Sequence, residues 1–231
     1  MEEIFFTAGM SSPEGLLYIV STPIGNLKDI TLRALEVLKE VDFIACEDTR
    51  HTLKLLNHYG IKKPLLSYFA PKEKEKSQRI IKLLKEGKKG ALVTDSGTPL
   101  VSDPGLFLIQ KCIEEGIKLV PVPGPSALLA ALVVAGLDTS RFHFFGFPPR
   151  KSRKKYFLSK KELEGTLIFY ERANRVKSLM KAAFEVLGDR KVVIARELTK
   201  LHEEVLRGRL SDFLEWEGKG EVVVLIGGKI L

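Results

Sequence analysis

Short apolar runs alternate with amphipathic stretches along the first half of the chain. The runs predict buried strands at 16–20, 42–46, 64–68, 91–93 and 117–122. Apolar residues spaced three and four apart predict helices between them, at 31–40, after Arg50 as far as Tyr59, at 74–86 and at 106–113. This alternation is typical of a parallel, doubly wound α/β sheet. Residues 1–14 carry no clear pattern and are expected to form an N-terminal arm.

The second half of the chain has a different pattern. Three prolines in residues 121–125 interrupt the alternation, so we place a domain boundary between an N-terminal domain, 15–122, and a C-terminal domain, 123–231. Beyond it, strands are predicted at 142–147, 166–170, 192–195 and 221–226, and helices at 127–135, 153–163, 176–187 and 210–215. This mixture predicts a mixed-sheet α+β domain.

Residues 94–105 join a predicted strand to the helix that starts at Leu106. Two glycines and two prolines in this segment fix an irregular backbone, and its polar side chains include those of Ser96, Thr98, Ser102 and Asp103. Ligands bind at the carboxyl ends of strands in open α/β sheets. We therefore interpret the segment as a ligand-binding loop rather than as an ordinary strand-to-helix turn.

The composition is that of a soluble globular protein. Of the 231 residues, 45% are hydrophobic and 29% charged, and no apolar run approaches the roughly 20 residues of a membrane span. The first residues lack the positive charges of a signal peptide, and the only two cysteines, Cys46 and Cys112, match no metal-site spacing. We expect a cytoplasmic location and no metal.

The common phosphate-binding signatures are missing. The sequence has no Gly-x-x-x-x-Gly-Lys-Ser/Thr, and the loop after the first predicted strand lacks Gly-x-Gly-x-x-Gly. Asp95 and Asp103 in the 94–105 loop would repel a phosphate, whereas carboxylates suit hydroxyls, an ammonium or a sulfonium. This favours a nucleoside-like or cationic ligand over a nucleoside triphosphate or NAD.

An acid pair follows the second predicted strand, on the same edge of the sheet. Glu47 and Asp48 precede Arg50, a grouping that suits substrate binding or proton transfer. Acidic residues are also favoured in the first turn of a helix by its dipole, so the pair has an equally good structural interpretation.

The net charge of +8 is concentrated in one segment. Residues 148–161 contain seven cations, no acidic residue before Glu162, and the aromatic residues Tyr156 and Phe157; the cations are Arg150, Lys151, Arg153, Lys154, Lys155, Lys160 and Lys161. Closely spaced cations suit a phosphate backbone, and aromatic rings stack on bases. Because a solvated loop usually balances its charges, we favour contact with nucleic acid.

Several stretches taken together resemble the tetrapyrrole (corrin/porphyrin) methylases, the class III S-adenosylmethionine-dependent methyltransferases. The matching stretches, in chain order, are 22–31, 45–50, 95–105, 123–127, 145–148, 171–175 and 196–200. Within this superfamily the chain is most similar to the enzymes that methylate a cytidine 2′-oxygen of 16S rRNA. Ser96 replaces the alanine usual in the family, a small change that should not disturb binding.

The resemblance implies two domains with S-adenosylmethionine in the cleft between them. The residues that it assigns to the cofactor are Asp95, Gly97, Thr98, Pro99, Val101, Ser102, Ser126, Ala127, Tyr170, Gly220 and Glu221. The residues expected to bind the substrate are Pro23, Asn26, Arg50, Arg150, Lys151, Lys154, Lys155, Arg172, Arg196 and Lys200. Members of the family are commonly homodimers.

The expected activity is 2′-O-methylation of a cytidine in the decoding region of 16S rRNA, in free rRNA or in the 30S subunit. A ribose hydroxyl is a poor nucleophile, so a base should assist it, and the candidates are Glu47, Asp48 and Glu197. Two alternatives stay open: a precorrin methyltransferase, and a non-catalytic RNA-binding or assembly factor that binds the cofactor only as a ligand.

Overall fold

The computed structural model describes residues 15–68 and 73–229, so the predicted N-terminal arm lies outside the described residues. The chain divides into two compact units. The first unit comprises the chain up to Thr22 together with Ile30–Gly124, and the second comprises Pro23–Asp29 together with the chain from Pro125. The chain thus passes from the first unit into the second over Pro23–Asp29 and then returns to the first. The sequence pattern does not predict this crossing.

The first unit is built on a parallel five-stranded sheet. Its strands are β1 (Leu16–Val20), β2 (Phe43–Cys46), β3 (Leu65–Ser67), β4 (Lys89–Val93) and β5 (Lys118–Val122). They lie in the order β3-β2-β4-β1-β5, and every pairing is parallel. The edge position of β5 explains how it accommodates Pro121, which has no backbone N–H to donate.

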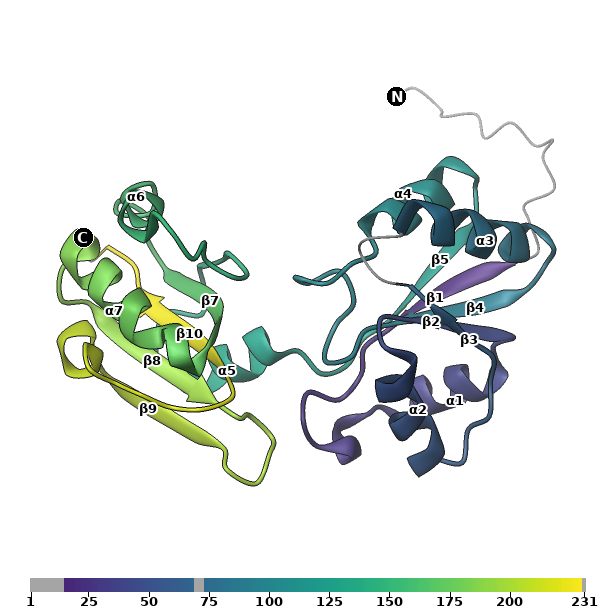
Figure 1. Ribbon diagram of the computed structural model, residues 1–231, viewed down its shortest axis with the longest axis horizontal. Helices are drawn as coiled ribbons and strands as arrows, with labels where there is room; N and C mark the ends of the chain where they lie inside the picture. The colour runs from purple at the N-terminus through teal and green to yellow at the C-terminus, as the bar shows by residue number, and fades with distance from the viewer. Residues whose placement is uncertain (1–14, 69–72, 230–231) are drawn as a thin grey trace, which may run out of the picture. The chain divides into compact units, whose positions relative to one another are not determined.

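Helices cover both faces of this sheet (Figure 1). They are α1 (Leu32–Glu40), α2 (Thr49–His58), α3 (Glu73–Lys85) and α4 (Leu106–Glu114). α1 and α2 pack in one hydrophobic cluster with Val20 and Ile44, whereas α3 and α4 pack in another with Leu17 and Leu92. The parallel, doubly wound α/β domain predicted from the sequence is confirmed.

The second unit contains a mixed five-stranded sheet. Its strands are β6 (Phe142–Phe144), β7 (Thr166–Arg172), β8 (Lys191–Arg196), β9 (Glu204–Arg209) and β10 (Glu221–Gly227). They lie in the order β6-β7-β10-β8-β9; β6 pairs with β7 in parallel and the other pairings are antiparallel. The mixed-sheet second domain is therefore also confirmed.

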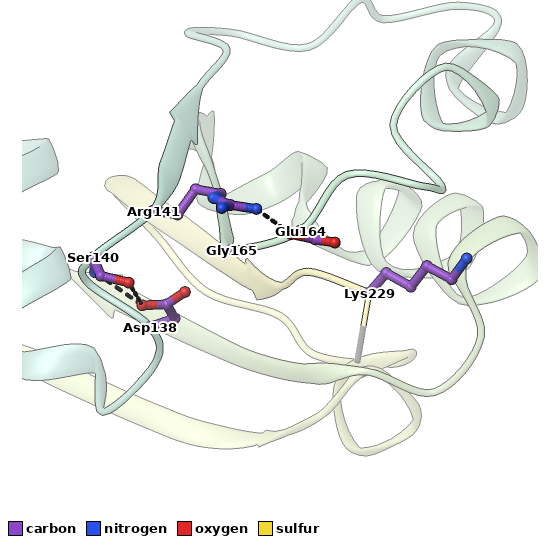
Figure 2. Close-up of a pocket in the computed structure, with 6 residues that line it drawn as sticks. All are labelled: Asp138, Ser140, Arg141, Glu164, Gly165 and Lys229. Atoms are coloured by element: carbon purple, nitrogen blue, oxygen red, sulfur yellow. Dashed lines mark hydrogen bonds and ion pairs between the residues drawn. The ribbon is translucent and has the colours of Figure 1, made fainter. Parts of the chain in front are cut away.

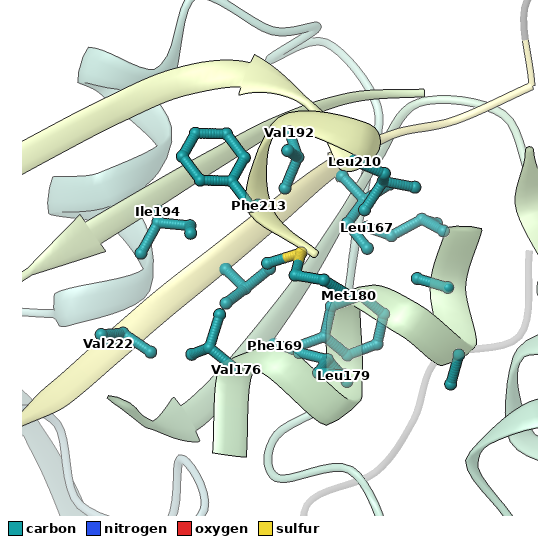
Figure 3. Packing of buried hydrophobic residues seen from close by; sticks show 14 of the residues in the cluster. Leu167, Phe169, Val176, Leu179, Met180, Val192, Ile194, Leu210, Phe213 and Val222 are labelled. Atoms are coloured by element: carbon teal, nitrogen blue, oxygen red, sulfur yellow. The ribbon is translucent and has the colours of Figure 1, made fainter. Parts of the chain in front are cut away.

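Two separate hydrophobic clusters lie against this sheet. α5 (Ala127–Ala135) packs with Ile168, Val193 and Leu225. The other cluster contains residues of α6 (Arg153–Leu158), α7 (Ala173–Leu187) and the 3-10 helix η3 (Leu210–Phe213). In this second cluster, Met180 of α7 lies close to Leu210 and Phe213 (Figure 3).

Some predicted elements differ from the structure. The sequence pattern does not predict strand β9, because its sequence, EVLRGR, places charged and small residues along a half-exposed edge strand and shows no apolar alternation. The predicted helix 153–163 ends at Leu158, and the predicted helix 210–215 is the 3-10 helix η3. α7 begins three residues earlier than predicted, at Ala173. Among the helices of the described residues, none is long and apolar enough to cross a membrane.

Candidate active site

The loop 94–105 is fastened to the end of the neighbouring strand β1. Thr22 donates its backbone N–H to the Gly97 carbonyl over 2.8 Å and accepts from the Gly97 N–H over 3.0 Å. The buried hydroxyl of Thr22 donates to the Thr94 carbonyl over 3.0 Å, and the Ser21 hydroxyl donates to Thr98 Oγ1 over 3.2 Å. These bonds hold the start of the loop in one conformation at the carboxyl edge of the sheet.

The same loop carries backbone strain. Leu100 and Ser102 both have φ of 70°, in the left-handed region that residues with a Cβ rarely adopt. Such strain persists only where the surroundings impose it, and it concentrates at binding and catalytic sites. The strained backbone supports the interpretation of 94–105 as a ligand-binding loop.

The far end of the loop is held by Glu73, a residue that the sequence pattern did not single out. Its Oε1 atom accepts the backbone N–H groups of Gly105, over 3.1 Å, and Phe107, over 3.2 Å. The buried Tyr68 hydroxyl donates to the same oxygen over 2.8 Å. A carboxylate at the N-terminus of α4 also complements the helix dipole. Glu73 therefore fixes the end of the loop to the start of α3.

Acidic side chains gather at this edge of the first unit. The backbone N–H of Asp48 donates to Asp95 Oδ1 over 3.2 Å, which joins the end of β2 to the 94–105 loop. Burial raises the pKa of Glu47, and the nearby carboxylates of Asp95, Asp103 and Asp48 raise it further. Glu47 consequently binds a proton more readily than an ordinary glutamate.

Asp48 is in a different situation from its neighbour. It is the N-cap residue of α2, and its carboxylate accepts from the Arg50 backbone N–H over 2.8 Å and from the Arg50 side chain over 2.8 and 3.2 Å. These hydrogen bonds hold the pKa of Asp48 well below its usual range. Asp48 thus has the helix-capping role that the sequence left open, whereas the environment of Glu47 favours proton transfer.

The third candidate base, Glu197, lies in the second unit beside two predicted cofactor residues. Its Oε1 atom accepts from Lys200 Nζ over 3.1 Å and from the Glu221 N–H over 3.4 Å. Gly220 has φ of 88°, and a Cβ there would lie 2.3 Å from the same carboxylate oxygen. The carboxylate of Glu197 is therefore packed and hydrogen-bonded by the loop that leads into β10.

Three further predicted cofactor residues lie together at the start of α5. Ser126 is the N-cap residue of this helix, but its side chain makes no capping hydrogen bond. The Tyr170 hydroxyl instead accepts the Leu128 N–H over 3.2 Å. The structure thus brings Ser126, Ala127 and Tyr170, from separate parts of the second unit, to one helix terminus.

The segment 23–29, called the strap here, packs on the tip of the β8–β9 hairpin, residues 197–203. The Asn26 N–H donates to Thr199 Oγ1 over 3.1 Å. A Cβ at Gly25 would lie 2.4 Å from Cγ of Lys200 and 3.1 Å from the Leu198 carbonyl oxygen, so a larger residue here would require the Lys200 side chain or the hairpin tip to shift. Asn26 and Lys200 were predicted as substrate residues from distant stretches, and these contacts bring their two segments together. At the hairpin tip, Thr199 has φ of 66°, in the left-handed region.

The basic segment 148–161 divides into structural and exposed cations. Arg153, Phe157 and Lys160 are buried, so the predicted stacking of Phe157 on a base is wrong. Tyr156 is half-buried and lies 3.6 Å from Lys160 Nζ, measured to its ring centroid. Lys154 pairs with Glu185. Within the described ranges no carboxylate pairs with the exposed side chains of Arg150, Lys151 and Lys155.

A pocket of about 290 Å³ lies elsewhere in the second unit (Figure 2). Its lining residues are Asp138, Ser140, Arg141, Glu164, Gly165 and Lys229. Arg141 pairs with Glu164, and Lys229 pairs with Glu162 just outside the lining. None of the sequence-predicted site residues lines this pocket, and its charges are already balanced within the protein.

The chemistry at the edge of the first unit suits a cationic ligand with hydroxyl groups. The polar side chains of the 94–105 loop are carboxylates and hydroxyls, and this loop contains no lysine or arginine. Carboxylates stabilise an ammonium or sulfonium, while hydroxyls and backbone groups bond a ribose or an adenine edge. Over the residues that the structure describes, no group of His, Cys, Asp and Glu has the arrangement of a metal site.

Known proteins resemble this chain closely. The ribosomal RNA small subunit methyltransferase I of Thermotoga maritima is 50% identical over 220 residues, which cover 93% of this chain and 99% of that protein. The protein of the same name from a Hydrogenobaculum species is 47% identical over 220 residues, covering 91% and 94%. A crystal structure of diphthine synthase has the same fold, with a TM-score of 0.74 at 18% identity over 94% of this chain and 91% of that chain.

The family model for the tetrapyrrole (corrin/porphyrin) methylases matches residues 16–214, which include every described strand except β10. The matched residues include most of both sheets and the strained loop after β4. The chain belongs to the tetrapyrrole (corrin/porphyrin) methylase family.

Proposed function

We propose that this protein is an S-adenosylmethionine-dependent methyltransferase that methylates the 2′-oxygen of a cytidine in the decoding region of 16S rRNA. The observation that carries the proposal is the 50% identity, over nearly the whole of both chains, to a ribosomal RNA small subunit methyltransferase. The exposed cations of the basic segment support an RNA substrate, because a tetrapyrrole methyltransferase has no need of them.

The donor set at the first unit fits the proposed cofactor. When bound, S-adenosylmethionine supplies an electrophilic methyl group on a positively charged sulfur. Asp95 and the backbone of Gly97 to Ser102 are proposed to hold it from the first unit. Ser126, Ala127, Tyr170, Gly220 and Glu221 are proposed to hold it from the second. The fastened, strained loop supports this assignment because it presents backbone groups in a fixed geometry.

Glu47 is proposed as the general base. In this role the Glu47 carboxylate would take the proton of the 2′-hydroxyl, and the bound cofactor would supply the methyl group that replaces this proton on the oxygen. A raised pKa makes Glu47 a better proton acceptor than Asp48, whose carboxylate is occupied by Arg50. The carboxylate of Glu197 already accepts a hydrogen bond from Lys200, so it suits a positioning role in the second unit.

The substrate is proposed to be gripped by cations from several elements. Arg50 has a largely exposed side chain at the start of α2, and Arg172 is exposed at the start of α7. Arg196 and Lys200 lie on or near the β8–β9 hairpin, with Pro23 and Asn26 on the strap beside it. Cations of this kind position an RNA backbone without reading its sequence.

The test is a panel of methyl acceptors. The protein is incubated with S-adenosylmethionine labelled in the methyl group and with 30S subunits, naked 16S rRNA or a precorrin, and incorporation into each is measured. Label in either RNA substrate supports the proposal and identifies the preferred form. Label in the precorrin alone would establish the tetrapyrrole alternative, and cofactor binding without transfer to any acceptor would establish a non-catalytic factor.

The proposal extends to the state of the protein in the cell. A homodimer is expected from the family resemblance, and light scattering of the purified protein measures it directly. A cytoplasmic location follows from the proposed rRNA substrate.

A further inference from the structure

We propose that Arg153 and Glu171 are positioning residues that hold the exposed cations of the basic segment in the geometry that binds RNA. The inference rests on the proposed function, because it assigns the basic segment to an RNA substrate. It differs from the sequence interpretation, in which Arg153 is simply one of the closely spaced cations that suit a phosphate backbone.

Arg153 is buried in the middle of an exposed cationic stretch. Its exposed fraction is 7%, whereas Arg150, Lys151, Lys154 and Lys155 on either side are exposed. The guanidinium therefore points into the second unit while its neighbours face solvent. A buried cation cannot contact a phosphate backbone, so its role must be exerted through the residues that it holds.

The guanidinium bonds three separate parts of the second unit. It pairs with the carboxylate of Glu171, which is only 1% exposed at the end of β7. Its Nη1 donates to the Arg175 carbonyl over 3.0 Å and to Ser178 Oγ over 2.9 Å, both on α7. Its Nε donates to the Pro149 carbonyl over 3.0 Å. One side chain thus ties the basic segment to a strand and to a helix.

These bonds fix the short exposed turn that carries Arg150 and Lys151. Arg153 anchors both ends of this turn, through its own place at the start of α6 and through Pro149. Between the anchors, Ser152 has φ of 59°, a strained conformation that persists only where the surroundings impose it. The other oxygen of Glu171 accepts the Arg172 N–H over 2.9 Å, so the pair also orients the start of α7.

A role in stability alone is a weak explanation for this pair. Taking two charges out of water costs much of what their attraction returns, and apolar residues of similar volume often replace a buried ion pair without loss of stability. The fork of the guanidinium, however, holds several acceptors in fixed directions, which an apolar side chain cannot do. The geometry points to positioning as the reason for the charges.

The test compares the double variant Arg153→Met/Glu171→Leu with the wild type and with Arg153→Lys. Melting temperature, S-adenosylmethionine affinity, 16S rRNA affinity at several salt concentrations, kcat and KM for the RNA are measured, and so is amide exchange of residues 150–152. We expect the double variant to melt near the wild type and to keep its cofactor affinity. Its RNA affinity should fall about tenfold, with a shallower salt dependence, a raised KM and faster exchange. Arg153→Lys, which keeps the charge without the fork, should also lose RNA affinity.

The outcomes separate the inference from the proposed function. A folded double variant with unchanged RNA affinity and salt dependence would overturn the positioning role. If the double variant fails to fold, the RNA affinity and salt dependence of Arg153→Lys decide the question. Unchanged values in that variant would then overturn the positioning role. Wild-type protein that binds 16S rRNA but methylates none of it would overturn the proposed function, while the binding comparison would still decide the positioning role. Wild-type protein that does not bind RNA would overturn both.

Discussion

The backbone N–H of Asn26 donates to the side-chain oxygen of Thr199 over 3.1 Å, across 173 residues of sequence. The contact joins the strap that follows β1 to the tip of the β8–β9 hairpin. Two stretches that resemble the same family of methylases thus form one surface, with Asn26 and Lys200 side by side. The contact gives the first prediction, because it depends on a glycine.

Gly25→Ala is expected to separate the strap from the hairpin tip. The new Cβ would lie 2.4 Å from Lys200 Cγ and 3.1 Å from the Leu198 carbonyl oxygen, so the Lys200 side chain or the hairpin tip must shift. We expect the free energy of unfolding to fall by about 1–3 kcal/mol and RNA methylation to fall with it. Gly227→Ala is the matched control, because a Cβ there meets nothing closer than 3.6 Å. Equal effects of the two substitutions on urea unfolding would rule out the close approach.

The assignment of the base predicts unequal effects of neighbouring substitutions. Glu47→Gln removes the proton acceptor and should lower the single-turnover rate by about 10²-fold or more, with cofactor affinity unchanged. Asp48→Asn keeps an acceptor oxygen for the α2 N-terminus and should lower the rate much less. A Glu47→Gln variant that turns over normally would remove Glu47 from the mechanism.

The pH dependence of the reaction tests the same assignment. Because the pKa of Glu47 is raised, the rate should decline in acid at a higher pH than the usual glutamate value of about 4.3 would give. Asp95→Asn removes a like charge, which lowers the pKa of Glu47, so the decline should move to lower pH. The measurement is kcat against pH at saturating cofactor and RNA. A decline that stays in place, or moves to higher pH, would contradict the electrostatic argument.

The exposed cations of the basic segment predict a salt-dependent contact. Replacing Arg150, Lys151 and Lys155 together by Gln should weaken 16S rRNA binding and flatten its dependence on salt by about 0.7 per lost phosphate contact on a single strand. Cofactor affinity should stay the same. A charge-matched control replaces Lys85, Lys111 and Lys177, which are paired with glutamates. If the control weakens RNA binding as much as the test variant does, only net charge matters.

The architecture followed from the sequence because it depends on local patterns. The apolar runs and the amphipathic helices between them predict the first sheet, and the three prolines at 121–125 lie close to Gly124, where the units divide. Strand β9 could not be predicted from the sequence, since an edge strand with half-exposed, charged positions shows no apolar alternation.

The candidate site could be predicted only in part. Gly97 could be assigned to the candidate site because it stands in a stretch that resembles the family, and Tyr170 directly precedes another such stretch. The burial of Arg153, the anchoring of the loop by Glu73 and the packing of the strap on Thr199 were not, because each depends on a partner that is distant in the sequence or on burial. Charge spacing alone does not separate Arg153, which pairs with Glu171, from Lys151, which faces solvent.

The most direct test of the central claim is the chemical identity of the methylated nucleoside. 30S subunits or naked 16S rRNA are treated with the protein and labelled S-adenosylmethionine, the RNA is digested to nucleosides, and the labelled product is identified by mass spectrometry. The account predicts that the label is found in 2′-O-methylcytidine. Label on a base, label in a nucleoside other than cytidine, or no label in RNA would contradict it.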